Sequence, residues 1–317
     1  MNVISLFAGI GGLDSGFIQN GFDVIWANDF DKYAVQTYKA NYKNPIILGD
    51  LNQIKLESIP NADVIIGGFP CQPFSMMGEM KGFEDTRGTL FFRIVEIIKN
   101  QISRGNKPKA LVLENVRNLK LHDNGNTFKV IKKTLEDLGY TVYDKILNSA
   151  DYGIPQTRNR TFIVCFSNNK IQFNYPEKKV LDLTLQDLLE HDVADKYYLS
   201  DKILPTILSN GTGGYKGKSE IDLKIARPLC ATMAKMHRAC QDNYVTQNGK
   251  VRRLTPRECA RLQGFSDDFV IPVSDTQAYK QFGNAVTVNV SNAVASMVKN
   301  ALIKNGEWKW IKYSKKN

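Results

Sequence analysis

Short apolar runs alternate with amphipathic stretches throughout the first 165 residues of the chain. Several of these runs are apolar throughout, which is typical of strands in a sheet that is covered on both faces. The predicted strands are 2–8, 23–29, 45–50, 63–69, 110–115, 140–147 and 161–166, and the predicted helices are 12–21, 32–42, 89–102 and 126–139. Strand–helix alternation of this kind predicts a doubly wound α/β domain.

The regular pattern ends near residue 176. Residues 204–237 are rich in Gly, Lys and Thr and contain only short β-like runs, which predicts a small, loop-rich insert. Residues 254–265 predict a short helix with Thr255 as its N-cap and Pro256 at its first position. Residues 289–304 predict a final amphipathic helix that returns to the first domain.

Positive charge gathers in two parts of the chain, whose net charge is +10. Residues 196–261 contain thirteen Lys and Arg against five Asp and Glu, and residues 299–317 contain six Lys against one Glu. Clustered cations favour a polyanion such as a phosphate backbone, but a solvated lysine-rich surface gives the same count. Charge alone leaves both interpretations open.

Composition argues against several other classes of protein. Five cysteines, an odd number without CxxC spacing, indicate neither a disulfide framework nor a zinc ribbon. Cys230, His237 and Cys240 match no common metal finger, so we expect no metal. No apolar run reaches membrane-spanning length and residues 1–12 lack a signal-peptide pattern, so we expect no membrane partner and a cytoplasmic location.

A glycine-rich turn, Gly9–Gly12, follows the first predicted strand and opens the first predicted helix. Such a turn lets a ligand approach the backbone, although it could also serve packing alone. Asp14 stands where the dinucleotide pattern GxGxxG has its third glycine, which argues against a nicotinamide oxidoreductase. Asp29 and Asp50 end the next two strands, where carboxylates suit a ribose and an adenine amino group. Without a clear anion-cradling lysine, this adenosine pocket favours S-adenosylmethionine over a nucleoside triphosphate.

Cys71 lies between Pro70 and Pro73 at the C-terminal end of the fourth predicted strand. Ligands bind at this edge in open α/β sheets, and the flanking prolines restrict the backbone so that the thiol is aimed. A buried structural cysteine normally sits inside an apolar run, as Cys165 does. Cys71 is therefore predicted to be a nucleophile.

Three charged side chains fall at neighbouring strand ends. Glu114 ends the fifth predicted strand, where its carboxyl could act as a general acid opposite the thiol. Arg158 and Arg160 enter the seventh strand two residues apart, so both guanidinium groups are expected in the same cleft. Arginines near a cysteine favour its thiolate form. A purely structural, ion-pairing role for Arg158 is the open alternative.

Six motifs occur in a fixed order: FAGIGG, GGFPCQPFS, ENV, QTRNR, RRLTPRECARLQGF and QFGNAV. With them the chain resembles the cytosine-5 DNA methyltransferases of bacterial restriction–modification systems, over all but roughly residues 177–250. The resemblance implies a doubly wound mixed sheet of the S-adenosylmethionine-dependent methyltransferase type, with a small loop-rich β insert as target recognition domain. It implies a catalytic domain at 1–176 plus 276–317 and a recognition domain at 177–275.

The resemblance also implies a mechanism. Carbon 5 of cytosine is too poor a nucleophile to accept a methyl group unaided, and the Cys71 thiolate is implied to add to carbon 6. Glu114 corresponds to the glutamate that contacts N3 and the exocyclic amine. Arg160 corresponds to an arginine near the base and the thiol, and Arg158 to its neighbour in the motif. The cytosine lies inside the duplex, so it must be flipped out.

Further residues are assigned by the resemblance to S-adenosylmethionine, whose product is S-adenosylhomocysteine. They are Phe7 and Phe30 beside the adenine, Gly9, Ile10, Gly11 and Gly12 at the methionine and ribose, Asp29 at the ribose hydroxyls, Asp50 and Leu51 at the adenine amino edge, Pro70 at the methyl-donor side and Asn284 near the methionine carboxylate. For Phe7 a plain core position is the alternative.

The insert is expected to read DNA sequence, largely from the major groove. The predicted DNA contacts are Tyr215, which could fill the gap left by the flipped base, Thr232 near the target backbone, and Lys235, His237, Arg238 and Arg253. For any one of these side chains, a solvated loop position without base contact is the alternative.

The implied partner is double-stranded DNA, methylated by a monomer that pairs in function with a cognate restriction endonuclease without forming a stable complex. An RNA-directed relative acting on tRNA is a second hypothesis. That branch typically carries Cys-Phe-Thr in its insert, whereas this chain has Cys-Ala-Thr at 230–232. A third hypothesis is a DNA-binding regulator without chemistry, which is disfavoured because every catalytic position is filled.

Overall fold

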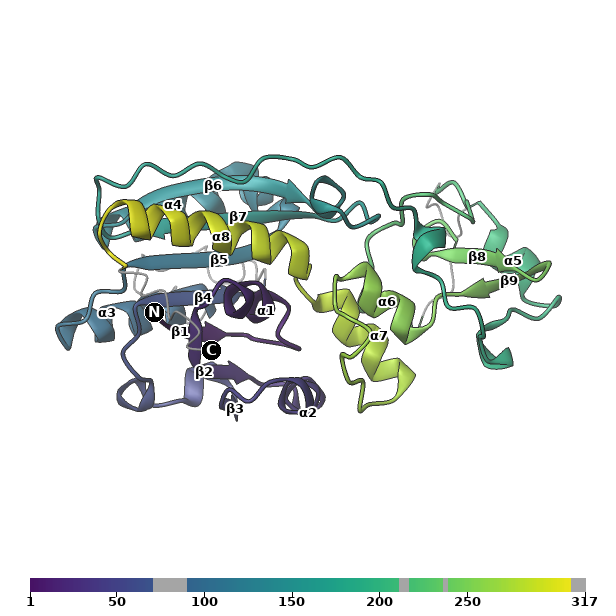
Figure 1. The fold of residues 1–317 in the computed structure, drawn as a ribbon, viewed down its shortest axis with the longest axis horizontal. Coiled ribbons are helices and arrows are strands. Elements are labelled where there is room, and N and C mark those ends of the chain that lie inside the picture. Colours follow the sequence, from purple (N-terminus) through teal and green to yellow (C-terminus); the bar gives the residue numbers. More distant parts are fainter. Residues whose placement is uncertain (71–89, 211–216, 236–238, 309–317) are drawn as a thin grey trace, which may run out of the picture.

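The computed structural model describes residues 1–70, 90–210, 217–235 and 239–308. Figure 1 shows a large lobe built on a seven-stranded sheet and a smaller lobe that contains a two-stranded hairpin. None of the helices in the described residues is both long enough and apolar enough to cross a membrane.

All seven predicted strands are present in the large lobe. They are β1 (Asn2–Leu6), β2 (Asp23–Asp29), β3 (Ile46–Leu48), β4 (Val64–Gly68), β5 (Ala110–Val116), β6 (Thr141–Asn148) and β7 (Asn159–Phe166). Their order in the sheet is β3-β2-β1-β4-β5-β7-β6. β1 pairs in parallel with both β2 and β4, whereas β7 runs antiparallel between β5 and β6. The predicted doubly wound mixed sheet is therefore confirmed.

Helices cover both faces of this sheet. They are α1 (Gly12–Gln19), α2 (Lys32–Asn41), α3 (Leu90–Ser103), α4 (Asn126–Asp137) and α8 (Val288–Lys304). Phe17 of α1 and Val294 of α8 pack in one core with Val3, whereas Ile94 of α3 packs in the other with Ile4. Adjacent residues of β1 thus point to opposite cores, as the alternation of a strand requires.

The smaller lobe has little regular structure. It contains α5 (Leu204–Leu208), the antiparallel pair β8 (Tyr244–Gln247) and β9 (Lys250–Arg253), α6 (Pro256–Leu262) and α7 (Asp275–Asn284). α6 begins as predicted, because the Thr255 hydroxyl accepts from Glu258 N at 3.1 Å and Pro256 takes the first helical position. α7 is not among the predicted helices. It lies beside α6, between the hairpin and the sheet (Figure 1).

Candidate active site

A cavity of about 370 Å³ opens at the carboxyl ends of the parallel strands. It lies where β1 has β2 on one side and β4 on the other, which is the switch point at which open α/β sheets bind ligands. Its wall comes from the ends of β1, β2, β4 and β5, from β7, from the first turns of α1, α2 and α3, and from α7 and its connection to α8. Its volume suits a small organic ligand, since such pockets measure about 300–1,000 Å³.

The glycine turn after β1 is held from two sides. Asp29, at the end of β2, accepts from Gly9 N and Asp31 N, each at 2.8 Å. Burial raises the pKa of Asp29, while these main-chain donors lower it. A Cβ atom on Gly12 would lie 2.2 Å from the main-chain oxygen of Val286, so only glycine lets the α7–α8 connection come this close. The turn and that connection therefore form one wall of the cavity.

Most of the residues predicted to bind the cofactor line this cavity. They are Phe7, Gly9, Ile10, Gly12, Asp29, Phe30, Pro70 and Asn284. Phe7 also packs against the core, so it meets both interpretations of its role. Phe30 is 73% exposed and its ring offers an apolar face on the cavity wall.

Three residues predicted to bind the cofactor do not line the cavity: Gly11, which faces the ring of Tyr42, and Asp50 and Leu51, which were assigned to the adenine edge. Asp50 instead accepts from Asn52 N at 3.0 Å and caps the short 3₁₀ helix Leu51–Gln53, and Leu51 is buried in the core. A lysine that was not predicted does line the cavity. Lys280 Nζ lies 2.6 Å from Asp31 Oδ2, and no pattern predicted its helix, α7.

Glu114 and Arg160 form an ion pair on the cavity wall. Arg160 Nε lies 3.0 Å from Glu114 Oε1, and the two side chains are 21% and 10% exposed. Burial raises the pKa of Glu114, although Arg160 and Arg158 lower it. A raised pKa increases the protonated fraction near neutral pH, and a protonated carboxyl can donate to a ligand.

The main chain just before Cys71 is fixed against the same wall. Asn115 Nδ2 donates to the main-chain oxygen of Phe69 at 2.9 Å, and both Asn115 and Pro70 line the cavity. Asn115 belongs to the ENV motif, but the sequence predicted no role for it. Cys71 itself lies outside the described residues.

Arg158 departs from the expected geometry. It precedes β7, is 1% exposed and does not line the cavity that contains Arg160. Its guanidinium donates to the main-chain oxygens of Leu229, Gly283 and Ala285. The two arginines therefore do not share a cleft, because the alternation of side chains applies only within a strand.

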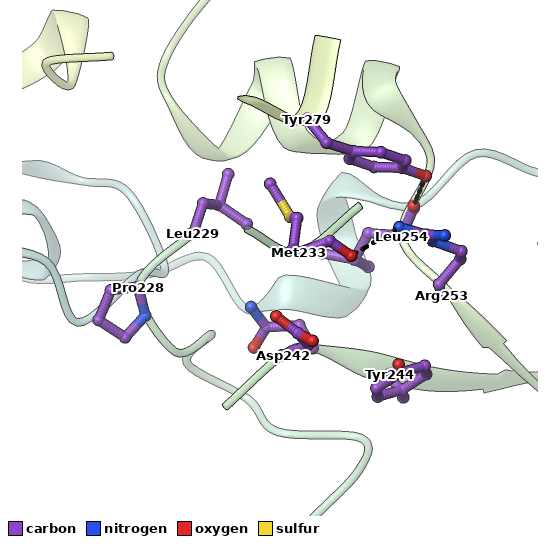
Figure 2. Close-up of a pocket in the computed structure, with 9 residues that line it drawn as sticks. Pro228, Leu229, Met233, Asp242, Tyr244, Arg253, Leu254 and Tyr279 are labelled. Atoms are coloured by element: carbon purple, nitrogen blue, oxygen red, sulfur yellow. Dashed lines mark hydrogen bonds between the residues drawn. The ribbon is translucent and has the colours of Figure 1, made fainter. Parts of the chain in front are cut away.

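The predicted DNA contacts are only partly described. Tyr215, His237 and Arg238 lie outside the described residues. Thr232 and Lys235 are exposed. The guanidinium carbon of Arg253 lies 4.3 Å from the ring centre of Tyr279, and its Nη2 donates to the main-chain oxygen of Met233 at 3.0 Å (Figure 2).

These contacts surround a second cavity in the smaller lobe. Its volume of about 20 Å³ has room for about one water molecule, which excludes a cofactor. Among the described residues, no group of three or more His, Cys, Asp or Glu is arranged to hold a metal ion.

Comparisons with known proteins agree with this arrangement. Residues 1–300 match the family model of C-5 cytosine-specific DNA methylases. The chain is 45% identical over 307 residues to the type II methyltransferase M.SsoII of Shigella sonnei, covering 93% of this chain and 79% of that one. It is 42% identical over 314 residues to M.NlaX of Neisseria lactamica, covering 95% and 96%. The S. pombe Dnmt2 methyltransferase shares the fold, with a TM-score of 0.79, 19% identity and coverage of 96% and 99%.

Proposed function

Because the chain belongs to the family of C-5 cytosine-specific DNA methylases, we propose that its large cavity binds S-adenosylmethionine together with a cytosine flipped out of duplex DNA. The activity that follows from this membership is the sequence-specific transfer of a methyl group to carbon 5 of cytosine in DNA, as in type II restriction–modification.

The position of Glu114 carries the assignment of the reacting groups. One carboxylate oxygen contacts Arg160, and the other lies beside Gly68, where a Cβ atom would be 3.1 Å away. This second oxygen is free of protein partners among the described residues and lies on the cavity wall. Burial raises the pKa of Glu114, which favours the protonated form that could donate to N3 of the cytosine ring.

Cys71 is the proposed nucleophile. Its thiolate adds to carbon 6, the ring double-bond electrons move to carbon 5, and Glu114 donates to N3 as the ring gains electrons. Carbon 5 then takes the methyl group, and S-adenosylhomocysteine leaves. The carbon 5 proton passes to solvent, its bonding electrons restore the double bond between carbons 5 and 6, and the bond from carbon 6 to sulfur breaks to return the thiolate. N3 returns its proton to Glu114, which restores the starting enzyme. The described chain supports this placement, because it reaches the cavity wall at Pro70.

The residues on the rest of the wall fit S-adenosylmethionine, which when bound supplies an electrophilic methyl group on a cationic sulfur. The Gly9–Gly12 turn lets the ligand approach the backbone, Asp29 is placed for the ribose hydroxyls, and Phe30 offers an aromatic face to the adenine. Asn284, exposed at the end of α7, is assigned to the methionine carboxylate.

Residues 177–275 are proposed to recognise the DNA target, and residues 1–176 plus 276–317 to carry the chemistry. Thr232 and Lys235 are exposed and available for DNA contact, whereas the contacts of Arg253 with Tyr279 and Met233 favour a supporting role. The enzyme is proposed to act as a monomer on double-stranded DNA, in functional partnership with a restriction endonuclease.

A covalent trap tests the proposed nucleophile. Bisulfite sequencing of DNA from a bacterial host that expresses the protein identifies the target, and a duplex with 5-fluorocytosine at that position is then incubated with enzyme and S-adenosylmethionine. Fluorine cannot leave as the proton does, so the enzyme should stay bonded to the DNA through Cys71. Cys71→Ser should abolish trapping, and Cys240→Ser, which removes a thiol outside the cavity, should not. Trapping that survives Cys71→Ser would overturn the assignment.

A further inference from the structure

Residues Pro155–Arg158, the junction segment, lie just before β7 of the large lobe. They are hydrogen-bonded to residues 226–229, which lead into residues 229–235, the recognition loop. Thr157 N donates to the main-chain oxygen of Ala226 at 2.9 Å, and Ala226 N donates to that of Pro155 at 2.8 Å. These reciprocal bonds place residues 226–229 alongside the junction segment, as in an added parallel strand. The segment therefore holds a part of the chain that lies some 70 residues away.

Gln156 extends this contact with its side chain, which is fully buried. Its Oε1 accepts from Leu229 N at 2.9 Å, and its Nε2 donates to the main-chain oxygen of Leu262 at 2.7 Å. One amide thus bridges the start of the recognition loop and the end of α6. A buried amide with both ends bonded fixes the distance between its two partners.

Arg158 bridges the recognition region and the cofactor site. Its Nη1 donates to Leu229 O at 3.0 Å, and its Nη2 donates to Gly283 O and Ala285 O, each at 2.9 Å. The last two oxygens flank Asn284, which lines the large cavity. Burial and the nearby Arg160 lower the pKa of Arg158 to about 9, so the guanidinium remains charged at neutral pH.

Gly283 brings the same two chain segments into direct contact. A Cβ atom on Gly283 would lie 2.3 Å from Ala231 N, which is closer than any side chain allows. The backbone at residues 283–285 and the backbone at residues 229–231 are therefore pressed together and bonded to one guanidinium. Neither segment can move without disturbing the other.

We infer that Gln156 and Arg158 are positioning residues that couple DNA binding to cofactor binding. The inference rests on the proposed function, because it takes residues 229–235 as a DNA-binding loop and Asn284 as a cofactor residue. A ligand that orders one of the two segments lowers the entropy cost of ordering the other, and the coupling is reciprocal by thermodynamic linkage. Arg160 lies two residues after Arg158 and forms an ion pair with Glu114. The junction segment is therefore also linked to the proposed catalytic carboxyl.

Hydrogen–deuterium exchange on the wild-type protein gives the first test. S-adenosylhomocysteine, which cannot react, is added without DNA. We expect slower exchange in the cavity wall at Gly9–Gly12 and around Asn284, and also at residues 226–231 in the smaller lobe. Protection confined to the cavity wall would overturn the inference while leaving the proposed function intact. Absence of protection at the cavity wall would contradict the proposed function itself.

Variants give the second test. The coupling factor is the ratio of the dissociation constants for S-adenosylhomocysteine measured without and with unmethylated duplex DNA. For the wild type we expect a factor within about 5–150-fold, the usual span of coupling between sites. Arg158→Lys removes the forked contact with three oxygens, and we expect it to reduce the factor towards one. Gly283→Ala should also reduce the coupling factor towards one, because its Cβ atom would push residues 229–231 away from residues 283–285.

Arg104→Lys is the matched control, because Arg104 also donates to a main-chain oxygen, that of Ile59, outside the junction. It should keep the wild-type coupling factor. Melting temperatures establish that each variant is folded before its coupling is compared. Wild-type coupling in both Arg158→Lys and Gly283→Ala would overturn the inference. If neither variant folds, the exchange experiment on the wild-type protein decides.

Discussion

Two of the arginine–glutamate pairs among the described residues have the same chemistry in different surroundings. The pocket pair, Arg160 with Glu114, lies on the cavity wall, and the enclosed pair, Arg252 with Glu258, lies in the smaller lobe. Both side chains of the enclosed pair are 0% exposed, whereas those of the pocket pair are 21% and 10% exposed. The comparison shows what separates an ion pair that supports a fold from one that is available to a ligand.

The enclosed pair leaves no oxygen without a partner. Glu258 Oε1 accepts from Arg252 Nη2 at 2.6 Å and from Glu190 N at 2.8 Å. Its Oε2 accepts from Arg252 Nη1 and Thr255 N, each at 2.8 Å. A buried charge needs this degree of pairing to offset the loss of water. Among the described residues, Glu114 has one ion-pair contact, through Oε1, and its side chain lines the cavity, which is why it is the member of the comparison proposed to act on a ligand.

The largest effect is expected from Glu114→Gln. The amide keeps the shape of the carboxyl but cannot transfer a proton, so we expect kcat to fall by about 10²–10⁴-fold. Affinity for S-adenosylhomocysteine and the melting temperature should change little, since the pocket pair is partly solvated. Methyl transfer to unmethylated duplex DNA, followed with a labelled methyl group, measures the loss. If Glu114→Gln had the wild-type kcat, the pocket pair would have no more role in catalysis than the enclosed pair.

Glu258→Gln tests the other side of the comparison. Removal of one charge leaves Arg252 buried without compensation, which typically costs about 3–5 kcal/mol of stability. Thermal and urea unfolding measure the cost. Glu136→Gln is the control, because it breaks the exposed pair with Lys132 and should cost less than about 1 kcal/mol. A similar small cost for Glu258→Gln would mean that the enclosed pair does not stabilise the smaller lobe.

The sequence predicted that both residues of the pocket pair would lie near the site, although it predicted neither their ion pair nor the enclosed pair. Strands that are apolar throughout predict a sheet that is covered on both faces. A polar residue at the end of such a strand, such as Glu114, is therefore easy to recognise in the sequence. Arg252 and Glu258 lie on either side of a turn, where no period relates them, so their contact is visible only in the fold. Their motif predicted no more than the helix and its cap.

The position of Arg158 and the helix α7 could not be predicted from the sequence pattern. The shared cleft expected for Arg158 and Arg160 required both to be in a strand, but β7 begins at Asn159. α7 was not predicted because its apolar side chains are few, and only packing against α6 shows that Ala278, Tyr279 and Phe282 form one face. Pattern therefore predicted which strand ends carry the polar side chains, and tertiary contacts decided which of those side chains reach the cavity.

Asp14 is a buried carboxyl that has no cation partner in the part of the chain that the structure describes. It is 0% exposed, and its oxygens accept from Ser5 Oγ and Tyr38 OH, each at 2.7 Å. Burial raises its pKa from 3.8 to about 6. The folded state therefore binds more protons than the unfolded state between these values, and stability falls as pH rises from about 4 to 6.

Asp14→Asn should remove this pH dependence. A shift from 3.8 to about 6 corresponds to about 3 kcal/mol, which the wild type should lose relative to the variant as pH rises through this window. Urea unfolding at a series of pH values measures the difference in the free energy of unfolding. Parallel curves for the two proteins would show that Asp14 titrates in the folded state as it does in the unfolded chain.

The smallest effect is expected at the cap that joins the enclosed pair to α6. Thr255 and Glu258 form a capping box, and the Thr255 hydroxyl also donates to Glu190. Thr255→Ala should cost about 0.5–2 kcal/mol, whereas Thr255→Ser keeps the hydroxyl and should cost less. Because the carboxylate of Glu258 caps Thr255 N and binds Arg252 at once, Thr255→Ala combined with Glu258→Gln should destabilise less than the sum of the single variants. If the two losses in the free energy of unfolding simply add, the cap at Thr255 and the ion pair between Arg252 and Glu258 stabilise the smaller lobe independently.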